Sequence, residues 1–270
     1  MRLSSVCRFL SAAALAVACC APLAAQQAIT HYSSICVKVN PGREADFAGL
    51  LHGNIRKLQQ SLADSGLITE WLALRAEIPM GKQARCDYLF VTFFPGLPAE
   101  PMSDEAFTAE LHKAGLDMTP AQFWQPILED SYLVSNTVAE EVTRIGGIKV
   151  GDYVVDNSMK MPDVSECIAT EQKLWEPFAE ARISAGKQSG WRIWVTTYPR
   201  GSMVKDSAGT VDIYPTWDSI FNTGSEWMDT WDKVHPNVKP ADAMAQFDKQ
   251  CRITRSIVYK DVDDVRAATE

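Results

Sequence analysis

Aromatic side chains concentrated in the C-terminal half are the feature of this sequence that bears most directly on chemistry. The chain has eight tryptophans, and its second half holds Trp175, Trp191, Trp194, Trp217, Trp227 and Trp231. One interpretation is a bulky hydrophobic core. The other is an aromatic-lined pocket between the sheet and the helices of this half, because small-molecule pockets are mostly apolar with a few placed polar groups.

Polar residues close to these tryptophans in sequence could supply the placed groups. We take as candidate ligand-binding residues Asn157, Lys160, Trp194, Trp217 and His235, with Arg192 as a further polar group. Trp191 and Trp194 are three positions apart on one predicted strand, so their side chains fall on opposite faces and at most one can face a given pocket. The sequence assigns no catalytic residue, and whether the protein is an enzyme stays open.

Sequence motifs for metal-dependent or nucleophilic catalysis are absent. The histidines are spread along the chain, at His31, His52, His112 and His235. No HExxH or CxxC spacing would hold zinc, and no GxSxG, Walker A or GxGxxG motif occurs. Asp261, Asp263 and Asp264 cluster near the C-terminus, where we expect a solvated acidic segment rather than a catalytic pair. We therefore expect no metal site.

Residues 1–25 have the pattern of a secretory signal peptide. Arg2 and Arg8 form a basic start, a short apolar segment follows, and small residues lead to a cleavage site near Ala25. A lipoprotein signal with Cys19 as the lipid-carrying residue is the alternative. No other run is apolar for long enough to span a membrane, so we expect a periplasmic or secreted protein.

Charge narrows the range of partners. The chain has 34 acidic and 26 basic residues, giving a formal net charge of −8. This excess of negative charge argues against nucleic acid or an anionic membrane surface as a partner. The charge does not itself identify a partner. We expect a small-molecule ligand on other grounds, and the sequence does not define the oligomeric state.

Alternation and helical periodicity predict the same order of elements twice. The first half, residues 26–145, is expected to contain helices over 43–65 and 103–129 and strands over 33–39, 67–78, 86–94 and 132–142. The second half, residues 146–270, is expected to contain helices over 164–185 and 225–250 and strands over 153–161, 191–198, 210–217 and 253–262. The chain after Asp261 is expected to fray. Each half follows βαββαβ, the ferredoxin-like pattern.

An internal repeat supports this division. Residues 111–142 align without a gap on residues 231–262, with Pro120 on Pro240. The predicted strand 86–94 is apolar on both faces, which requires cover on both sides. We therefore predict an α+β fold in which two ferredoxin-like βαββαβ repeats pack as an intrachain α+β barrel and cover each other's open sheet faces.

Four cysteines follow the signal segment, two in each half. An exported protein can keep disulfides, and four cysteines allow three pairings. In the predicted topology Cys36 and Cys86 lie on neighbouring strands. Cys167 near the start of one helix lies at the same end of the sheet as Cys251, just past the other helix. Pairing within each half is therefore favoured, and four reduced cysteines buried as small hydrophobic residues are the alternative.

A short motif links the first half to a known superfamily. Residues 37–47, VKVNPGREADF, resemble the first strand, Pro-Gly turn and helix start of the dimeric α+β barrel superfamily, which includes antibiotic-biosynthesis-monooxygenase-like domains. In the second half, residues 159–163 keep the Lys and the Pro of the motif without the Gly. The resemblance implies the barrel fold. It does not select a function, because the superfamily includes cofactor-free oxygenases, lactone isomerases, heme enzymes and proteins without known activity.

The expected function is binding of a small apolar or aromatic molecule, with a cofactor-free oxygenase- or isomerase-like enzyme as its catalytic form. A heme-binding or heme-degrading enzyme is the first alternative. Its basis is a resemblance of Asn157, Trp217 and His235 to the Asn, Trp and His of heme-degrading members, and of His235 to the heme-holding histidine of chlorite-dismutase-like enzymes. The second alternative is a non-catalytic structural or interaction protein of the cell envelope.

Overall fold

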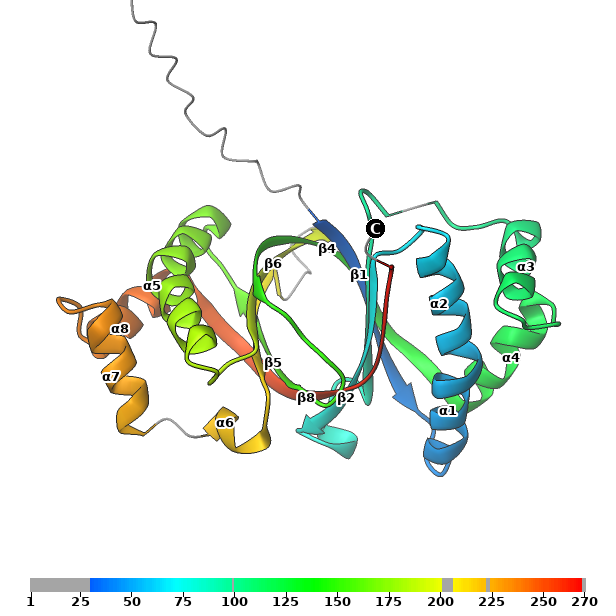
Figure 1. The fold of residues 1–270 in the computed structure, drawn as a ribbon, viewed down its shortest axis with the longest axis horizontal. Helices are drawn as coiled ribbons and strands as arrows, with labels where there is room; N and C mark the ends of the chain where they lie inside the picture. The colour runs from blue at the N-terminus through cyan, green and yellow to red at the C-terminus, as the bar shows by residue number, and fades with distance from the viewer. Residues whose placement is uncertain (1–29, 99, 201–205, 222–223, 269–270) are drawn as a thin grey trace, which may run out of the picture.

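Eight strands of the described chain close into a barrel in the order β1-β3-β2-β8-β5-β7-β6-β4. The structure, a computed structural model, describes residues 30–98, 100–200, 206–221 and 224–268. The predicted signal peptide and Cys19 lie outside the described residues. Figure 1 looks into the barrel, with one group of helices on each side of it.

The first half of the chain follows the predicted βαββαβ order. Its strands are β1 (Thr30–Val39), β2 (Glu70–Ile78), β3 (Tyr88–Phe93) and β4 (Ser131–Gly146). Its helices are α1 (Glu44–Leu50), the π-helical turn η1 (Leu51–Ile55), α2 (Arg56–Asp64), the short 3₁₀ turn η2 (Gly81–Gln83), α3 (Asp104–Lys113) and α4 (Pro120–Asp130). Local sequence sets the start of α4, because Thr119 and Gln122 form a capping box and Pro120 occupies the first helical position.

The second half repeats this order. Its strands are β5 (Tyr153–Lys160), β6 (Gly190–Tyr198), β7 (Ala208–Tyr214) and β8 (Arg252–Arg266). Its helices are α5 (Val164–Ser184), α6 (Trp217–Phe221), α7 (Ser225–Val234) and α8 (Pro240–Gln250). The side chain of Asp163 caps α5 by accepting hydrogen bonds from the backbone N–H groups of Ser165 and Glu166.

Two antiparallel strand pairs join the halves into one barrel. Within the halves the strand orders are β4-β1-β3-β2 and β8-β5-β7-β6, and the halves meet where β2 pairs with β8 and β4 pairs with β6. Every strand therefore has a neighbour on each side, and the barrel has no free edge among the described residues. This confirms the predicted α+β barrel of two ferredoxin-like units.

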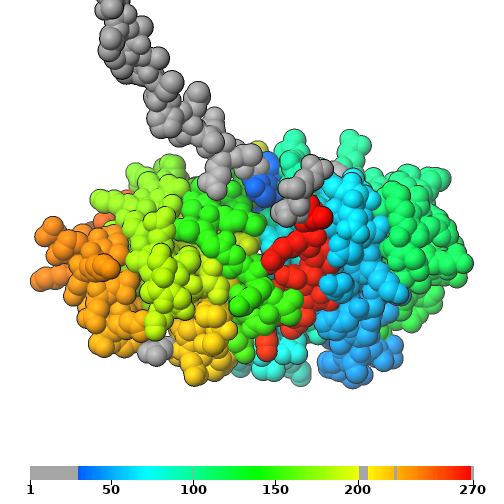
Figure 2. Space-filling model, in the orientation of Figure 1, coloured from blue at the N-terminus to red at the C-terminus, as the bar shows by residue number. Residues whose placement is uncertain are grey.

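Helices cover the outside of the barrel at its two ends along the long axis of the molecule. The α1–α4 group packs on one side and α5, α7 and α8 on the other (Figure 1). Figure 2 shows the two helical groups at opposite ends of the molecule, with the red end of β8 reaching the surface between them. Within the described residues, no helix has the length and apolar character needed to cross a membrane.

Strand alternation divides the buried residues between an outer and an inner layer. Odd-numbered residues of β1 and β6 face the helices: Val37 and Val39 pack with Phe47, while Trp191 and Ile193 pack against α5. Even-numbered residues of the same strands, such as Tyr32 and Trp194, point into the barrel. The inner layer is therefore a separate surface that belongs to neither helical core.

Both predicted disulfides are present. Cys36 is bonded to Cys86 and Cys167 to Cys251, each within one half of the chain. Cys167 and Cys251 are fully buried beneath α5 and α8 with Met159 and Phe247. The Cys36–Cys86 bond instead lies at the wall of the barrel interior.

Two expectations about the C-terminal half were wrong. Trp217 does not lie on a strand, because β7 ends at Tyr214 before Pro215, and Trp217 begins the short helix α6. The acidic segment after Asp261 does not fray. It continues β8 to Arg266, and both Asp261 and Asp263 are buried, because β2 pairs with it throughout this length.

Candidate functional site

The barrel encloses a cavity of about 620 Å³. Its walls are largely aliphatic and aromatic, and include Leu72, Leu74, Val91, Phe93, Val154 and Ile213. These side chains come from β2, β3, β5 and β7, so both halves contribute to one chamber. A volume of this size falls within the range of small-molecule sites, which are usually concave and mostly apolar.

Asp156 is the acidic group in the middle of this apolar chamber. It lies on β5 between Val154 and Ser158 on the inner face, and it accepts a hydrogen bond of 3.3 Å from the indole Nε1 of Trp194. Burial raises the pKa of the Asp156 carboxyl to about 6, and the nearby Arg255 opposes that rise. A carboxyl with such a pKa exchanges a proton near neutral pH, which suits a general base.

A glycine on the neighbouring strand makes room for Trp194. Trp194 on β6 pairs with Gly209 on β7, and a Cβ atom at position 209 would lie 2.5 Å from Cζ2 of the indole. Any larger residue at position 209 would therefore displace the ring. The absence of a side chain there lets the indole lie against the strand and reach Asp156.

Two tyrosines add polar atoms to the same chamber. Tyr32 and Tyr259 both line it. Burial, followed by the negative charge of Asp156, raises the pKa of both phenols well above the usual range, so both stay protonated. Neither hydroxyl makes a hydrogen bond within the described part of the chain. Each is available to donate to a bound molecule.

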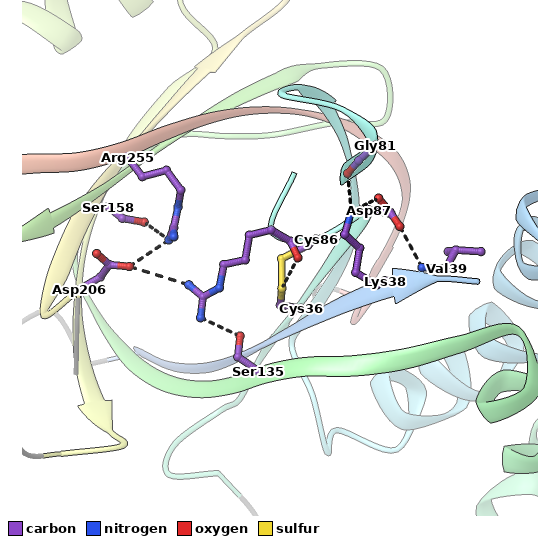
Figure 3. The surroundings of a disulfide bond; sticks show 11 residues. Cys36, Lys38, Val39, Gly81, Cys86, Asp87, Ser135, Ser158, Asp206 and Arg255 are labelled. Atoms are coloured by element: carbon purple, nitrogen blue, oxygen red, sulfur yellow. Dashed lines mark hydrogen bonds and ion pairs between the residues drawn. A yellow bond between two sulfur atoms is a disulfide. The ribbon is translucent and has the colours of Figure 1, made fainter. Parts of the chain in front are cut away.

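One end of the cavity carries a charged cluster beside the Cys36–Cys86 disulfide (Figure 3). Arg255 Nη2 donates to Asp206 Oδ2 and to Ser158 Oγ, each at 3.0 Å. Arg85 Nη2 donates to Ser135 Oγ at 3.1 Å, and Arg85 Nη1 lies 3.8 Å from the Asp206 carboxylate. Asp206 thus ties together two arginines from different halves of the chain.

The opposite end carries a second charged cluster around Arg192. Arg144 donates to Glu141 at 2.5 Å and to Glu70 at 2.9 Å. Arg192 is buried beside the same two carboxylates at longer distances, 3.5 Å from Glu141 and 3.8 Å from Glu70. The chamber therefore has an apolar middle with one carboxyl, and a charged group at each end.

Of the candidate residues named from sequence, Trp194 and Arg192 line this cavity. Asn157 lies on the other face of β5. Its amide donates to Asp212 at 3.0 Å, and its amide oxygen accepts from Ser256 at 2.6 Å. Lys160 is exposed at the end of β5. The structure therefore does not bring these two residues together with Trp194.

Trp217 and His235 also lie away from the cavity. The Trp217 ring packs against Tyr153 and Phe221 near the surface. His235 follows α7, where its Nε2 lies 2.8 Å from the carbonyl oxygen of Leu174 and its ring packs on Trp231 at 4.6 Å. Neither residue appears among those that line the chamber.

Most of the second-half tryptophans form packed core under the helices. Trp175, Trp227 and Trp231 pack together with Phe178, with ring centroids 4.8 to 6.2 Å apart. The hydrophobic-core interpretation therefore describes this group. The large cavity lies inside the barrel, and not between the sheet and the helices where the pocket was predicted.

Sequence reasoning missed Asp156, Tyr32 and Tyr259, and it named Arg192 for a different pocket. A signal was present in the alternation of β5, since Asp156 shares a face with Val154 and not with Asn157. In the described chain, no three His, Cys, Asp or Glu side chains gather in an arrangement that could hold a metal ion.

Comparisons with known proteins support the fold. No protein-family model and no curated protein matches the sequence. A candidate monooxygenase from Fusobacterium nucleatum subsp. nucleatum ATCC 25586 superposes with a TM-score of 0.55 at 7% identity, over 90% of this chain and 97% of that one.

Two further solved structures are similar at lower scores. An anthrone oxidase-like protein has a TM-score of 0.49 at 10% identity, over 90% of this chain and 95% of that one. A heme-binding protein from Thermus thermophilus has a TM-score of 0.47 at 10% identity, over 87% and 92% of the two chains. At 7% identity, the similarity to the Fusobacterium structure shows that the chain has an α+β barrel fold, and the fold alone.

Proposed function

We propose that the protein binds a small, largely apolar or aromatic molecule inside the barrel. The observation that carries the proposal is the cavity of about 620 Å³ with its apolar middle, in which Trp194, Asp156 and two tyrosine hydroxyls are exposed to a ligand. A chamber of this size sacrifices packing energy that a purely structural barrel would keep. This counts against the non-catalytic structural alternative.

Binding of the neutral naphthalene dye prodan tests this proposal. We expect one dye molecule per chain, with emission shifted to the blue by the apolar walls. Val91→Trp places a bulky side chain inside the barrel and is expected to weaken binding at least tenfold, while Leu128→Trp on the exposed face of α4 leaves it unchanged. A titration in which both variants bind like the parent protein would refute the site.

A proton-transfer enzyme is the catalytic form that Asp156 favours. A carboxylate in an apolar chamber can remove a proton from a carbon acid, and a neighbouring phenol can donate a hydrogen bond to the oxyanion that forms. Deprotonation of this kind is the first step that cofactor-free oxygenase-like and isomerase-like reactions share. Asp156 would act as the base, with Tyr32 and Tyr259 as hydrogen-bond donors.

Hydrogen–deuterium exchange into 2-tetralone, followed by NMR, measures this step. After subtraction of the buffer rate, exchange is expected to rise with pH to a plateau with its midpoint near the Asp156 pKa of about 6, because the ionised carboxylate is the active form. Asp156→Asn should lower the rate about 100-fold or more. Asp229→Asn, an exposed carboxylate on α7 away from the cavity, serves as the matched control. Equal rates in the parent protein and Asp156→Asn would exclude the base.

The heme alternative has less support from the residues present. A heme ligand in the chamber would need a side chain such as histidine, and no histidine lines the described cavity. His235 is held against the backbone of Leu174 in the helical layer. Tyr32 and Tyr259 line the cavity, but burial raises the pKa of both phenols and disfavours the tyrosinate that would bind iron, and the two cysteines that line it are joined in a disulfide. The residues of the barrel interior therefore do not fit heme, and we derive no step through it.

Export and internal duplication belong to the same proposal. Two disulfides are typical of proteins that fold in an oxidising compartment, which supports a periplasmic or secreted location after removal of residues 1–25. The matching strand orders of the two halves support residues 26–145 and 146–270 as tandem repeats of one ferredoxin-like unit.

A further inference from the structure

Arg192 is a buried cation placed at the end of the barrel chamber. It lies on β6, on the same inner face as Trp194, and only 7% of its side chain is exposed. It lines both the barrel cavity and an adjoining pocket of about 660 Å³. A ligand entering from either space would meet this guanidinium.

The guanidinium of Arg192 lacks the hydrogen bonds that burial normally requires. Its Nε has no partner in the described chain, and its Nη atoms lie 3.5 Å from Glu141 and 3.8 Å from Glu70, at or beyond the limit of a hydrogen bond. Arg144 donates to one oxygen of each carboxylate, Oε1 of Glu141 and Oε2 of Glu70, at shorter distances than Arg192 reaches. The two carboxylates offset the charge of Arg192. Its five N–H donors, however, are not satisfied by hydrogen bonds within the described residues.

The surroundings of Arg192 suit a flat anionic group. The Phe93 ring lies under the guanidinium at 5.2 Å, and the free hydroxyl of Tyr32 lines the same end of the chamber. Arg255 at the far end also has an unpartnered Nε among the described residues, but it differs from Arg192 because its Nη2 already donates to Asp206 and Ser158. Carboxylates bind arginine through two parallel hydrogen bonds, which would use donors that the protein leaves unpaired.

We propose that Arg192 binds the carboxylate of an apolar organic acid whose body occupies the barrel. This inference rests on the proposed function and deepens it by naming the charged group of the ligand. The body of the acid would lie along the aliphatic walls toward Trp194. Its carboxylate would complete the hydrogen bonding of Arg192, with the Tyr32 hydroxyl as a further donor.

A matched pair of probes tests the inference: 2-naphthoate and its neutral analogue 2-naphthamide, titrated by calorimetry at pH 7. The parent protein is expected to bind 2-naphthoate at least tenfold more tightly than 2-naphthamide. Arg192→Met should weaken 2-naphthoate at least tenfold and change 2-naphthamide less than threefold. The affinity of Arg192→Lys for 2-naphthoate should lie between those of the parent protein and Arg192→Met, because lysine keeps the charge without the two-pronged geometry. Arg255→Met in the same cavity should keep the preference for the acid.

The outcomes separate this inference from the proposed function. Equal binding of the two probes, or a preference that survives Arg192→Met, would overturn the role of Arg192 and leave the cavity as a site for neutral molecules. If Arg255→Met instead loses the preference for 2-naphthoate, the carboxylate binds at the Arg255 end of the cavity, and the role of Arg192 is also overturned. Failure of both probes and of prodan would overturn binding in the barrel altogether. If Arg192→Met does not fold, as judged by near-ultraviolet circular dichroism, the Arg192→Lys result decides.

Discussion

Replacing both Cys167 and Cys251 by alanine is expected to lower the free energy of unfolding by about 4 kcal/mol. The bond joins residues 84 positions apart. A cross-link across a loop of that length removes a large part of the freedom of the unfolded chain. Both residues are fully buried, so their loss also removes packing contacts beneath α5 and α8. Urea unfolding without reductant, followed by tryptophan fluorescence, measures the change.

The Cys36–Cys86 pair provides the matched control. Its bond spans 50 positions, so the double alanine variant should lose a similar amount of stability, again about 4 kcal/mol. Because this second bond lines the barrel cavity, its removal should also alter prodan affinity, whereas removal of Cys167–Cys251 should not. An unchanged urea midpoint in the Cys167→Ala, Cys251→Ala variant would mean that this bond does not stabilise the native protein.

Stability is expected to fall as the pH rises from about 4 to about 8, and Asp261 is a major contributor together with Glu171, whose pKa burial also raises. Asp261 is fully buried, and neither carboxyl oxygen has a partner in the described chain. Burial, with the negative charge of Asp264, raises the pKa of Asp261 to about 8. The folded state therefore binds this proton more tightly than the unfolded state, in which an aspartic acid titrates near pH ~4. Full ionisation of Asp261 above about pH 8 should therefore lower the free energy of unfolding by roughly 5 kcal/mol.

Asp261→Asn tests this explanation because the amide is similar in shape and cannot ionise. Its unfolding free energy should change less with pH than that of the parent protein, and above about pH 8 the variant should be the more stable. Asp156 and Asp212, each with a pKa near 6 caused by burial, add a smaller effect of the same sign at lower pH. Asp229→Asn, an exposed carboxylate on α7, should keep the parental slope. Parallel curves for Asp261→Asn and the parent would contradict the prediction.

The sequence predicted the architecture because its information is local and periodic. Alternating strands, amphipathic helices and the two-sided strand β3 together require a second sheet surface to cover the first, and the barrel supplies it. The disulfides followed from the same topology. The C-terminal errors have a local cause, because an acidic run such as Asp261–Asp264 is ordinarily solvated, and only pairing with the distant β2 reveals its burial.

The candidate site was harder to predict for a geometric reason. Polar residues on one face of a strand, such as Ser34, Asp156 and Ser158, have the pattern of a solvent-facing surface. In a closed barrel that face becomes the wall of a chamber, and the change depends on strands far apart in the chain, such as β2 and β8, meeting side by side. Asn157, one position away, faces the helices for the same reason. Periodicity shows which face of a strand a residue occupies, but it does not show whether that face contacts solvent, helices or an internal cavity.

The pairing of inner residues differs between the two halves. Leu74 pairs with Leu89 across β2 and β3. At the corresponding place in the second half, Trp194 pairs with Gly209 across β6 and β7. Trp194 and Gly209 together fill the space that two leucines fill in the first half, because the large indole is offset by the missing side chain. The strands therefore keep their spacing while one wall gains an indole.

This difference matters because the barrel is closed by a single chain. A barrel assembled from two identical subunits has a two-fold axis through its centre, and every interior group then occurs twice. Here the axis is only approximate: Arg192 takes the place that Leu72 holds in the other half, and Asp156 the place of Ser34. The broken symmetry gives the chamber distinct ends, so a molecule inside it has one preferred direction rather than two equivalent ones.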